Sequence, residues 1–201
     1  LQSPPMFLDE RLRNLIRERL RDGADKPGID ARIWETFGEE WCVMATDLSG
    51  FSRGVAEFGI IHFLQTIYEA ERILVPVIES HDGILLKVEG DSFLVIFRNV
   101  EKAIRASIEM QRTTRRYNAT RPPEEHVLLG VGLGFGPMLR IGDADVFGNE
   151  VNSACILGET YAGPYDVLVT KAVHDRGSGH RFEEIEHVPP GAEKAYRVLF
   201  E

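Results

Sequence analysis

The chain has 201 residues, a length that suits one domain with a short appendage. It carries 23 Lys and Arg against 32 Asp and Glu, a formal net charge of −9. This acidic balance argues against nucleic acid as a partner, because neutralising phosphates takes clustered basic side chains. Apolar runs such as residues 93–97 fall far short of the roughly 20 residues that span a bilayer. Two cysteines exclude a disulfide scaffold and a four-cysteine zinc site, and we expect Cys42 and Cys155 to be small buried hydrophobic residues.

The first 40 residues are predicted to form a helical extension. A helix that ends at Gly23 is indicated by apolar residues at three- and four-residue spacing, namely Leu8, Leu12, Leu15, Ile16 and Leu20. Asp30 is expected to cap a second short helix that runs through Phe37. This segment either completes a core or serves dimerisation or regulation. The amino terminus lacks a basic region followed by an apolar one, so we expect no signal peptide and a cytoplasmic location.

From Trp41 onward the pattern predicts alternating strands and helices. A buried strand ends at Asp47, and a turn through Ser52 leads into one long helix over residues 53–80. Two strands, 84–88 and 92–97, form a hairpin, and a helix over 100–117 follows. The remaining expected elements are a glycine-containing strand over 126–135, a helical segment over 148–161, a strand over 167–169 and two strands within 181–201.

This order predicts an α+β domain over residues 41–201. A β-α-β-β-α-β order builds a mostly antiparallel, ferredoxin-like sheet with two helices on one face, here extended by further C-terminal strands. Gly130, Gly132 and Gly134 alternate with β-forming residues, which is typical of a strand that another backbone approaches closely.

Two aspartates stand where this fold brings strand ends together. Asp47 ends the first strand and Asp91 lies at the hairpin tip. Taken singly, each is typical of an ordinary turn residue. Together, at neighbouring strand ends, they have the arrangement that holds Mg²⁺ with water and phosphate oxygens. The turn after Asp47 also offers backbone N–H groups at a helix start, which suits a phosphate.

Three segments now carry a family resemblance. Residues 47–52, 86–93 and 145–152 resemble, in order and spacing, the three motifs of the class III nucleotidyl cyclases, the adenylate and guanylate cyclase catalytic domain. The resemblance covers about residues 41–200 and leaves the amino-terminal segment outside it. It implies an enzyme, an adenylate cyclase-type phosphorus–oxygen lyase that converts a nucleoside triphosphate to a 3′,5′-cyclic nucleotide and pyrophosphate.

The resemblance also implies roles for individual residues. Asp47 and Asp91, with Leu48, would hold two Mg²⁺ or Mn²⁺ ions, and Asn152 would orient the ribose for catalysis. The phosphate-binding positions would be Gly50, Phe51 and Ser52. In this family each site is shared between two chains, with the aspartates from one and the base- and ribose-binding residues from the other. The implied assembly is therefore a symmetric homodimer.

Lys87 and Asp145 match the two positions that read the base. Lysine donates hydrogen bonds and aspartate accepts them, and adenine offers an acceptor nitrogen beside an amino donor. Guanine presents the opposite pattern, so the pair favours ATP over GTP. Cytosine offers the adenine pattern on a smaller ring, and CTP or UTP remains an alternative substrate. The alternative interpretation of the two residues is a surface salt bridge.

The chain also departs from the family pattern. Ile156 stands where the family usually has an Arg that stabilises the transition state, and Gly130 stands where another Arg meets the β-phosphate. Lys194 lies too late to match the phosphate-binding Lys before the last strand. Arg53, Arg140 and Lys194 are the candidate substitutes. These departures support a second hypothesis, a degenerate cyclase-homology domain that binds a nucleotide or dimerises as a signalling module.

Overall fold

The computed structural model describes residues 9–201, with the side chains of Phe51 and Ser52 outside the described part. The helices are α1 Glu10–Arg19, α2 Lys26–Phe37, α3 Phe51–Phe58, α4 Ile60–Ser80, α5 Val100–Asn118, α6 Asn149–Ile156 and α7 Lys171–Arg176. A 3₁₀ turn, η1, spans Pro123–Glu125, and a π-helical turn, η2, spans Leu157–Tyr161. The strands are β1 Gly38–Leu48, β2 Ile84–Glu89, β3 Ser92–Phe97, β4 Leu129–Ile141, β5 Asp145–Phe147, β6 Val167–Thr170, β7 Arg181–Ile185 and β8 Ala195–Leu199.

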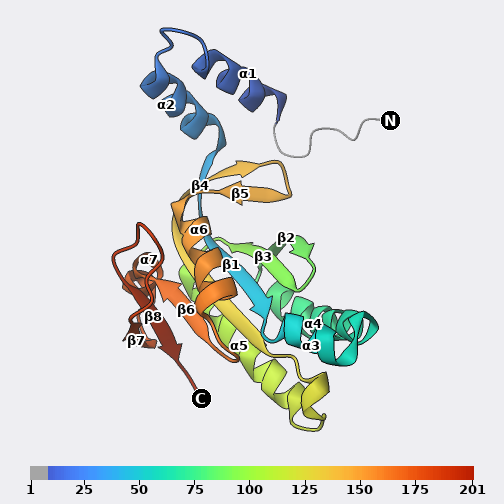
Figure 1. Ribbon diagram of the computed structural model, residues 1–201. Helices are drawn as coiled ribbons and strands as arrows, with labels where there is room; N and C mark the ends of the chain where they lie inside the picture. Colours follow the sequence, from blue (N-terminus) through green and yellow to red (C-terminus); the bar gives the residue numbers. More distant parts are fainter. Residues whose placement is uncertain (1–8) are drawn as a thin grey trace.

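These strands form one mixed sheet (Figure 1). Its order is β2-β3-β1-β4-β6-β8-β7, and β5 pairs with the far end of β4. The β4–β6 pair is parallel and the other pairs are antiparallel. The first four strands, in the spatial order β2-β3-β1-β4, are the predicted ferredoxin-like core, which is thereby confirmed. The carboxyl-terminal strands extend the same sheet.

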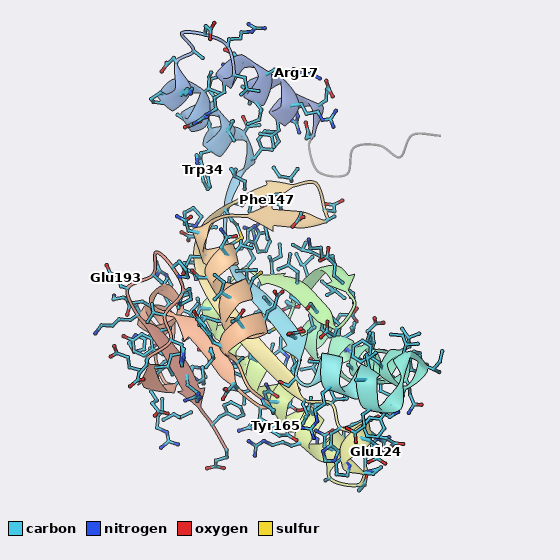
Figure 2. All side chains as sticks on the ribbon, viewed as in Figure 1. Arg17, Trp34, Glu124, Phe147, Tyr165 and Glu193 are labelled. Carbon is cyan, nitrogen blue, oxygen red and sulfur yellow. The ribbon has the colours of Figure 1, made fainter. Side chains whose placement is uncertain are left out.

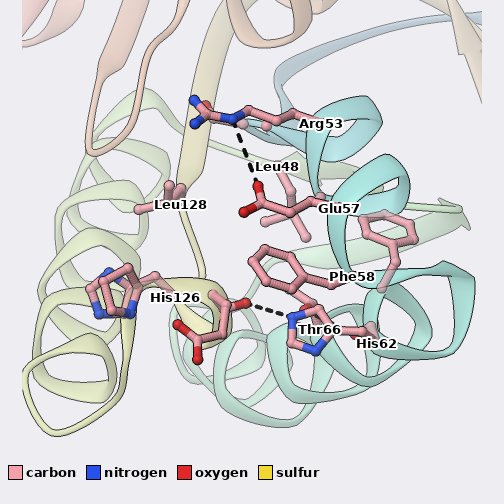
Figure 3. A pocket seen from close by; sticks show the side chains of 14 residues that line it. Leu48, Arg53, Glu57, Phe58, His62, Thr66, His126 and Leu128 are labelled. Carbon is pink, nitrogen blue, oxygen red and sulfur yellow. Dashed lines mark hydrogen bonds and ion pairs between the residues drawn. The ribbon is translucent and has the colours of Figure 1, made fainter.

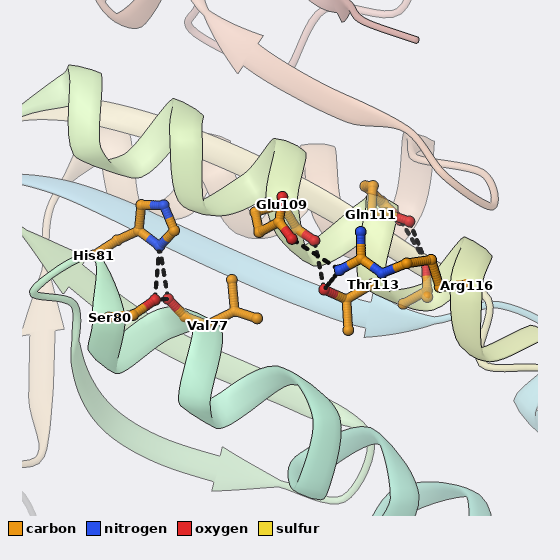
Figure 4. Close-up of polar contacts among 8 residues, drawn as sticks. Val77, Ser80, His81, Glu109, Gln111, Thr113 and Arg116 are labelled. Carbon is orange, nitrogen blue, oxygen red and sulfur yellow. Dashed lines mark hydrogen bonds and ion pairs between the residues drawn. The ribbon is translucent and has the colours of Figure 1, made fainter.

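Helices cover both faces of this sheet. In β1, Cys42 and Met44 point to the cluster beneath α4 and α5, while Trp41, Val43 and Ala45 point to the cluster beneath α6. The strand is therefore buried on both sides, which explains why it reads as one continuous apolar run. Gln111 of α5, which is labelled in Figure 4, ties this layer to the sheet, since its Nε2 donates to the carbonyl of Leu129 over 2.7 Å.

A row of glycines lets α6 and η2 lie directly on β4. A Cβ at Gly132 would stand 2.2 Å from the carbonyl oxygen of Ala154 and 2.5 Å from the amide nitrogen of Gly158. A Cβ at Gly134 would stand 2.4 Å from the carbonyl oxygen of Glu150. The predicted close approach of a second backbone is thus observed, and it leaves no room for a side chain at Gly132 or Gly134.

The helices α1 and α2 form a hairpin at the end of β4 (Figure 1). Its small core joins Leu12, Ile29 and Ile33 to Ile141 of β4. Figure 2 shows Arg17 and Trp34 on this hairpin and Phe147 on the neighbouring β5. The expected first helix is present, although Leu8 lies outside the described residues. The division of the chain at residue 40 stays a prediction.

The predicted cap at Asp30 is wrong. Asp25 caps α2, because its carboxylate accepts a hydrogen bond from the amide of Gly28, and Pro27 occupies the first turn. Asp30 lies within the helix and pairs with Arg19 of α1. The cap is therefore a local feature, an aspartate directly before a proline-containing first turn.

The single helix predicted over residues 53–80 is also wrong. The chain breaks at Gly59, whose φ of 86° is incompatible with a right-handed helix, and α3 and α4 result. The predicted strand over 126–135 begins later, at Leu129, and continues to Ile141. Three short elements were not predicted, η1, β5 and α7. Of these, β5 depends on pairing with β4 and α7 on the packing of Val173. In residues 9–201 no helix is long and apolar enough to cross a membrane.

The close approach on β4 makes a stability prediction. Replacing Gly132 by Ala forces a methyl group against fixed backbone, and we expect it to lower the free energy of unfolding by about 1–3 kcal/mol or more. Gly136→Ala is the matched control on the same strand, because its Cβ would meet only the Glu150 side chain, at 3.3 Å. Urea unfolding of both variants measures the difference. Equal losses for the two would contradict the close-approach argument.

Candidate active site

The strand register brings Asp47 and Asp91 to the same edge of the sheet. Ala45 of β1 lies opposite Leu94 of β3, so the strand end at Asp47 lies beside the turn that begins β3. Ser92 Oγ donates to Asp47 Oδ1 over 3.4 Å, and the amide of Phe93 donates to Thr46 Oγ1 over 3.0 Å. Asp91 is the residue before Ser92. The two aspartates that were predicted to meet therefore lie together.

The electrostatics of Asp47 show that this pair lacks a counter-charge. Burial raises the pKa of Asp47 to about 7, and pairing with and repulsion by the Asp91 carboxyl add to the rise. Glu159 of η2 raises it further. Burial, followed by the charges of Asp91 and Glu89, also raises the pKa of Glu159. Several carboxylates thus face one another at this edge.

The turn after Asp47 presents backbone donors beside the aspartates. Gly50 is the N-cap of α3 with a φ of 78°, and none of the side chains that the structure describes forms a capping hydrogen bond there. The amide of Ser49 donates to the carbonyl of Leu128 over 2.8 Å, which fixes the turn to the loop before β4. The first turn of α3 therefore carries unpaired N–H groups and the positive end of the helix dipole. Gly50 stands where it was expected, whereas the side chains of Phe51 and Ser52 lie outside the described part.

An open cleft of about 710 Å³, here called the aspartate cleft, collects these groups. It is lined by the carboxylates of Asp47, Glu89, Asp91 and Glu159, by Ser92, Arg53 and Ala162, and by Leu48, Ser49, Gly50 and Gly158. Among the described residues that line it, Arg53 is the only basic one. A second, apolar cleft of about 480 Å³ lies on the other side of Leu48 and Arg53 (Figure 3).

Lys87 and Asp145 also meet. Lys87 Nζ donates to Asp145 Oδ2 over 3.2 Å and lies 3.4 Å from Glu89 Oε1. Burial lowers the pKa of Lys87, but the hydrogen bond and charge of Asp145, together with Glu89, outweigh it and leave the pKa raised. A bulge between Leu85 and Lys87 interrupts β2 just before the lysine. A hydrogen-bond donor and an acceptor thus lie side by side and partly exposed, as a base-reading pair requires. The same contact is also the salt bridge of the alternative interpretation.

Helix α6 packs on β1 and β4. Asn152 is exposed, and Cys155 and Ile156 follow it at helical spacings of three and four, on the same side of the helix. Burial raises the pKa of the Cys155 thiol to about 11, followed by the nearby charge of Glu159, which Lys87 opposes. Cys155 is half-buried beside Lys87 rather than fully buried as predicted, whereas Cys42 is buried.

The structure shows where the candidate substitute cations lie relative to the aspartate cleft. A Cβ at Gly130 would stand 2.9 Å from the Cβ of Ala162, so β4 is closed there by the segment after η2. Arg140 lies at the far end of β4, stacked on Trp41 and 3.7 Å from Glu39. Lys194 Nζ lies 3.7 Å from Glu184 Oε2, before β8. Of the three candidate substitutes, Arg53 is the one that lines the aspartate cleft.

The donors present suit a hard divalent cation that phosphate oxygens help to bind. No cluster of three or more His, Cys, Asp or Glu is arranged as a metal site within residues 9–201. Mg²⁺ is commonly held by one or two carboxylates together with water and substrate phosphates, and two facing aspartates with uncompensated charge meet that requirement. Asp47, Asp91 and the carbonyl of Leu48 are the groups that would hold it.

Sequence reasoning missed Ser92 and Glu159. Ser92 directly follows Asp91, so its position in the hairpin was a usable signal. Glu159 gave no such signal, because it reaches the cleft only through the π-helical turn that follows α6. Single π-turns within helices often occur at functional sites.

Comparison with known proteins gives two curated relatives. No protein-family model matches the chain. It is 26% identical over 149 residues to "Putative adenylate cyclase 3" of Rhizobium meliloti (strain 1021), covering 74% of this chain and 25% of that protein. It is 30% identical over 134 residues to "Serine/threonine-protein kinase pkn2" of Myxococcus xanthus, covering 66% of this chain and 16% of that protein. The chain thus spans a quarter or less of the length of these relatives.

Solved structures share the fold over most of the chain. An "Adenylate/Guanylate Cyclase/Hydrolase" from Silicibacter pomeroyi superposes with a TM-score of 0.69 at 22% identity, over 82% of this chain and 98% of that one. The adenylyl cyclase CyaB from P. aeruginosa gives a TM-score of 0.68 at 16% identity, over 82% of this chain and 95% of that one. The described fold is therefore that of these cyclase domains.

The raised pKa of Asp47 predicts how stability depends on pH without divalent cations. A carboxyl whose pKa is higher in the folded than in the unfolded chain stabilises the fold at low pH, and this contribution is lost as pH rises from about 4 through 7. At pH 8, in EDTA, we expect Asp91→Asn to be more stable than wild type because the repulsion is removed. The advantage should shrink at pH 5.5.

Thermal melts at both pH values measure this effect, and Glu79→Gln, an exposed change at the end of α4, is the control. Excess Mg²⁺ should reverse the order at pH 8 by stabilising wild type more than Asp91→Asn. An advantage for Asp91→Asn that is the same at both pH values would contradict the coupling of the two carboxyls.

Proposed function

We propose that this chain, related to the class III nucleotidyl cyclases in fold and motif order, is a cyclase catalytic domain that acts as a homodimer. Its reaction would convert ATP into 3′,5′-cyclic AMP and pyrophosphate. The observation that carries the proposal is the meeting of Asp47 and Asp91, from separate segments, beside an uncapped helix start. Two carboxylates next to free backbone N–H groups form a site for a metal-bound triphosphate.

The residues divide the work of binding and orientation. Asp47, Asp91 and the carbonyl of Leu48 would hold the divalent cations, and the turn at Gly50 would donate N–H groups to phosphate oxygens. When bound, such cations would acidify the ribose 3′-hydroxyl and offset part of the negative charge of the triphosphate. The 3′-oxygen then forms a bond to the α-phosphorus, the bond to pyrophosphate breaks, and the hydroxyl proton is released to solvent.

Base selection would rest on the Lys87–Asp145 pair. The ammonium of Lys87 would donate to an adenine ring nitrogen, and the carboxylate of Asp145 would accept from the amino group. The two groups already lie 3.2 Å apart and partly exposed, so binding exchanges one contact for two. Exposed on α6, Asn152 suits a residue that orients the ribose of a nucleotide held mainly by a second copy of the chain.

One observation favours a second candidate function, a degenerate domain that binds nucleotide or dimerises without turnover. Gly130 lacks the cation of the family pattern, and the space where it would stand is filled by Ala162. Ile156 offers no charge one helical turn after Asn152. Removing one preorganised charge from a transition state typically lowers the rate by about 10²–10³.

The central test measures cyclic product. Wild type should yield product by mass spectrometry from ATP with Mg²⁺ or Mn²⁺, and less from GTP, CTP or UTP. Asp47→Ala and Asn152→Ala should each be inactive. Coexpressed, they should recover about a quarter of wild-type activity, because half of the dimers are mixed and each of these holds one intact site. A folded, dimeric wild type that yields no product would favour the degenerate domain.

The substitution at 156 gives a separate prediction. Ile156→Arg should raise turnover, by up to about 100-fold, because it places a cation one helical turn from Asn152. Ile156→Leu, which keeps the side-chain volume, is the control and should leave kcat unchanged. An arginine variant that folds and gives unchanged kcat would show that another group already fills the role.

A further inference from the structure

The aspartate cleft has an excess of negative charge for a triphosphate site. Four carboxylates line it, those of Asp47, Glu89, Asp91 and Glu159, against the single guanidinium of Arg53. A nucleoside triphosphate adds about four further negative charges, which bound divalent cations neutralise only in part once the carboxylates are counted. A symmetric second copy brings Ile156 and Gly130 again, so it repeats both missing cations. The phosphates therefore need a cation that the family pattern does not supply.

The position and the exposure of Arg53 suit this role. It stands in the first turn of α3, three residues after Gly50, at the wall shared by the aspartate cleft and the apolar cleft. Its side chain is 89% exposed, and its ion pair, with Glu57, is long, at 4.0 Å (Figure 3). An exposed pair of this kind contributes little to stability, so breaking it opposes a new contact only weakly.

Taking this geometry with the proposed function, on which the inference rests, we propose that Arg53 is a triphosphate-binding residue that takes the place of the missing arginines. In the absence of nucleotide it lies toward Glu57. With nucleotide bound it turns to the β- and γ-phosphates, where its planar donors form charge-assisted hydrogen bonds. Glu57 competes with the phosphates for the same guanidinium and thereby tunes affinity.

The test compares ligands that differ only in phosphate number. The probes are 3′-deoxy-ATP, which has no 3′-hydroxyl and cannot cyclise, and 3′-deoxyadenosine monophosphate. Each is titrated into the protein in the presence of MgCl₂, and calorimetry gives its Kd. We expect Arg53→Ala to weaken the triphosphate about tenfold or more and the monophosphate by less than about twofold. Arg53→Lys should retain part of the affinity. Arg112→Ala, an exposed arginine of α5 in another cleft, controls for the loss of one positive charge.

Glu57 gives a second, independent readout. Glu57→Gln should tighten triphosphate binding in the wild-type background and have no effect in the Arg53→Ala background. A similar gain in both backgrounds would show general electrostatics and overturn the competition. For ATP turnover, we expect Arg53→Ala to raise KM more than it lowers kcat, since contacts to the β- and γ-phosphates exist before the transition state.

The outcomes separate the two proposals. Wild type that binds and cyclises ATP, with Arg53→Ala indistinguishable from it, overturns the role of Arg53 and leaves the proposed function standing. Equal weakening of both probes also overturns that role, since it points to a disturbed turn rather than a lost phosphate contact. Wild type that binds neither probe and gives no product overturns both proposals.

Discussion

The close contact of α6 and η2 with the glycine row of β4 governs the rest of the structure. Carbonyl oxygens of α6 lie where a Cβ at Gly132 or Gly134 would stand, and Gly158 in turn lies against the backbone of β1, 2.4 Å from its would-be Cβ to the carbonyl oxygen of Ala45. The helix is therefore fixed in depth and direction by backbone contacts that no side chain can adjust. One end of it carries Glu159 to the aspartates, and its exposed side carries Asn152. This contact positions Glu159 and Asn152, whereas the register between β1 and β3 positions Asp47 and Asp91.

The same contact accounts for Gly130, one of the departures from the family pattern, through packing. With the segment after η2 lying on β4, Ala162 fills the space at Gly130, and a long basic side chain has no room there. The site is left with facing carboxylates and one loosely held guanidinium, an arrangement unfavourable in the free protein and favourable once cations and phosphates arrive. Like-charge pairs of this kind are typical of functional sites, since stability alone would select against them.

The fold is shared with nucleotidyl cyclases of different specificity, so it does not identify the nucleobase. The structural neighbours include adenylyl and guanylyl cyclases at 14–22% identity, so shared architecture does not choose the base. Lys87 and Asp145, the pair proposed to read the base, lie in direct contact. The relatives that are longer than this chain place similar segments in proteins with different names, a cyclase and a kinase.

The sequence by itself determined the ferredoxin-like core, the hairpin that carries Asp91, and the pairing of Asp47 with Asp91, because strand periodicity and turn residues are local signals. It also predicted the close backbone approach from alternating glycines. The break at Gly59 and the cap at Asp25 rather than Asp30 also come from local features, a glycine with positive φ and an aspartate before a proline-containing first turn. Only the tertiary structure decided the strand β5, because this strand forms only by pairing with β4. It alone placed Glu159 and singled out Arg53 among three candidate cations, since which charges share a cleft is set by the packing of α6 and α3 on the sheet and not by spacing along the chain.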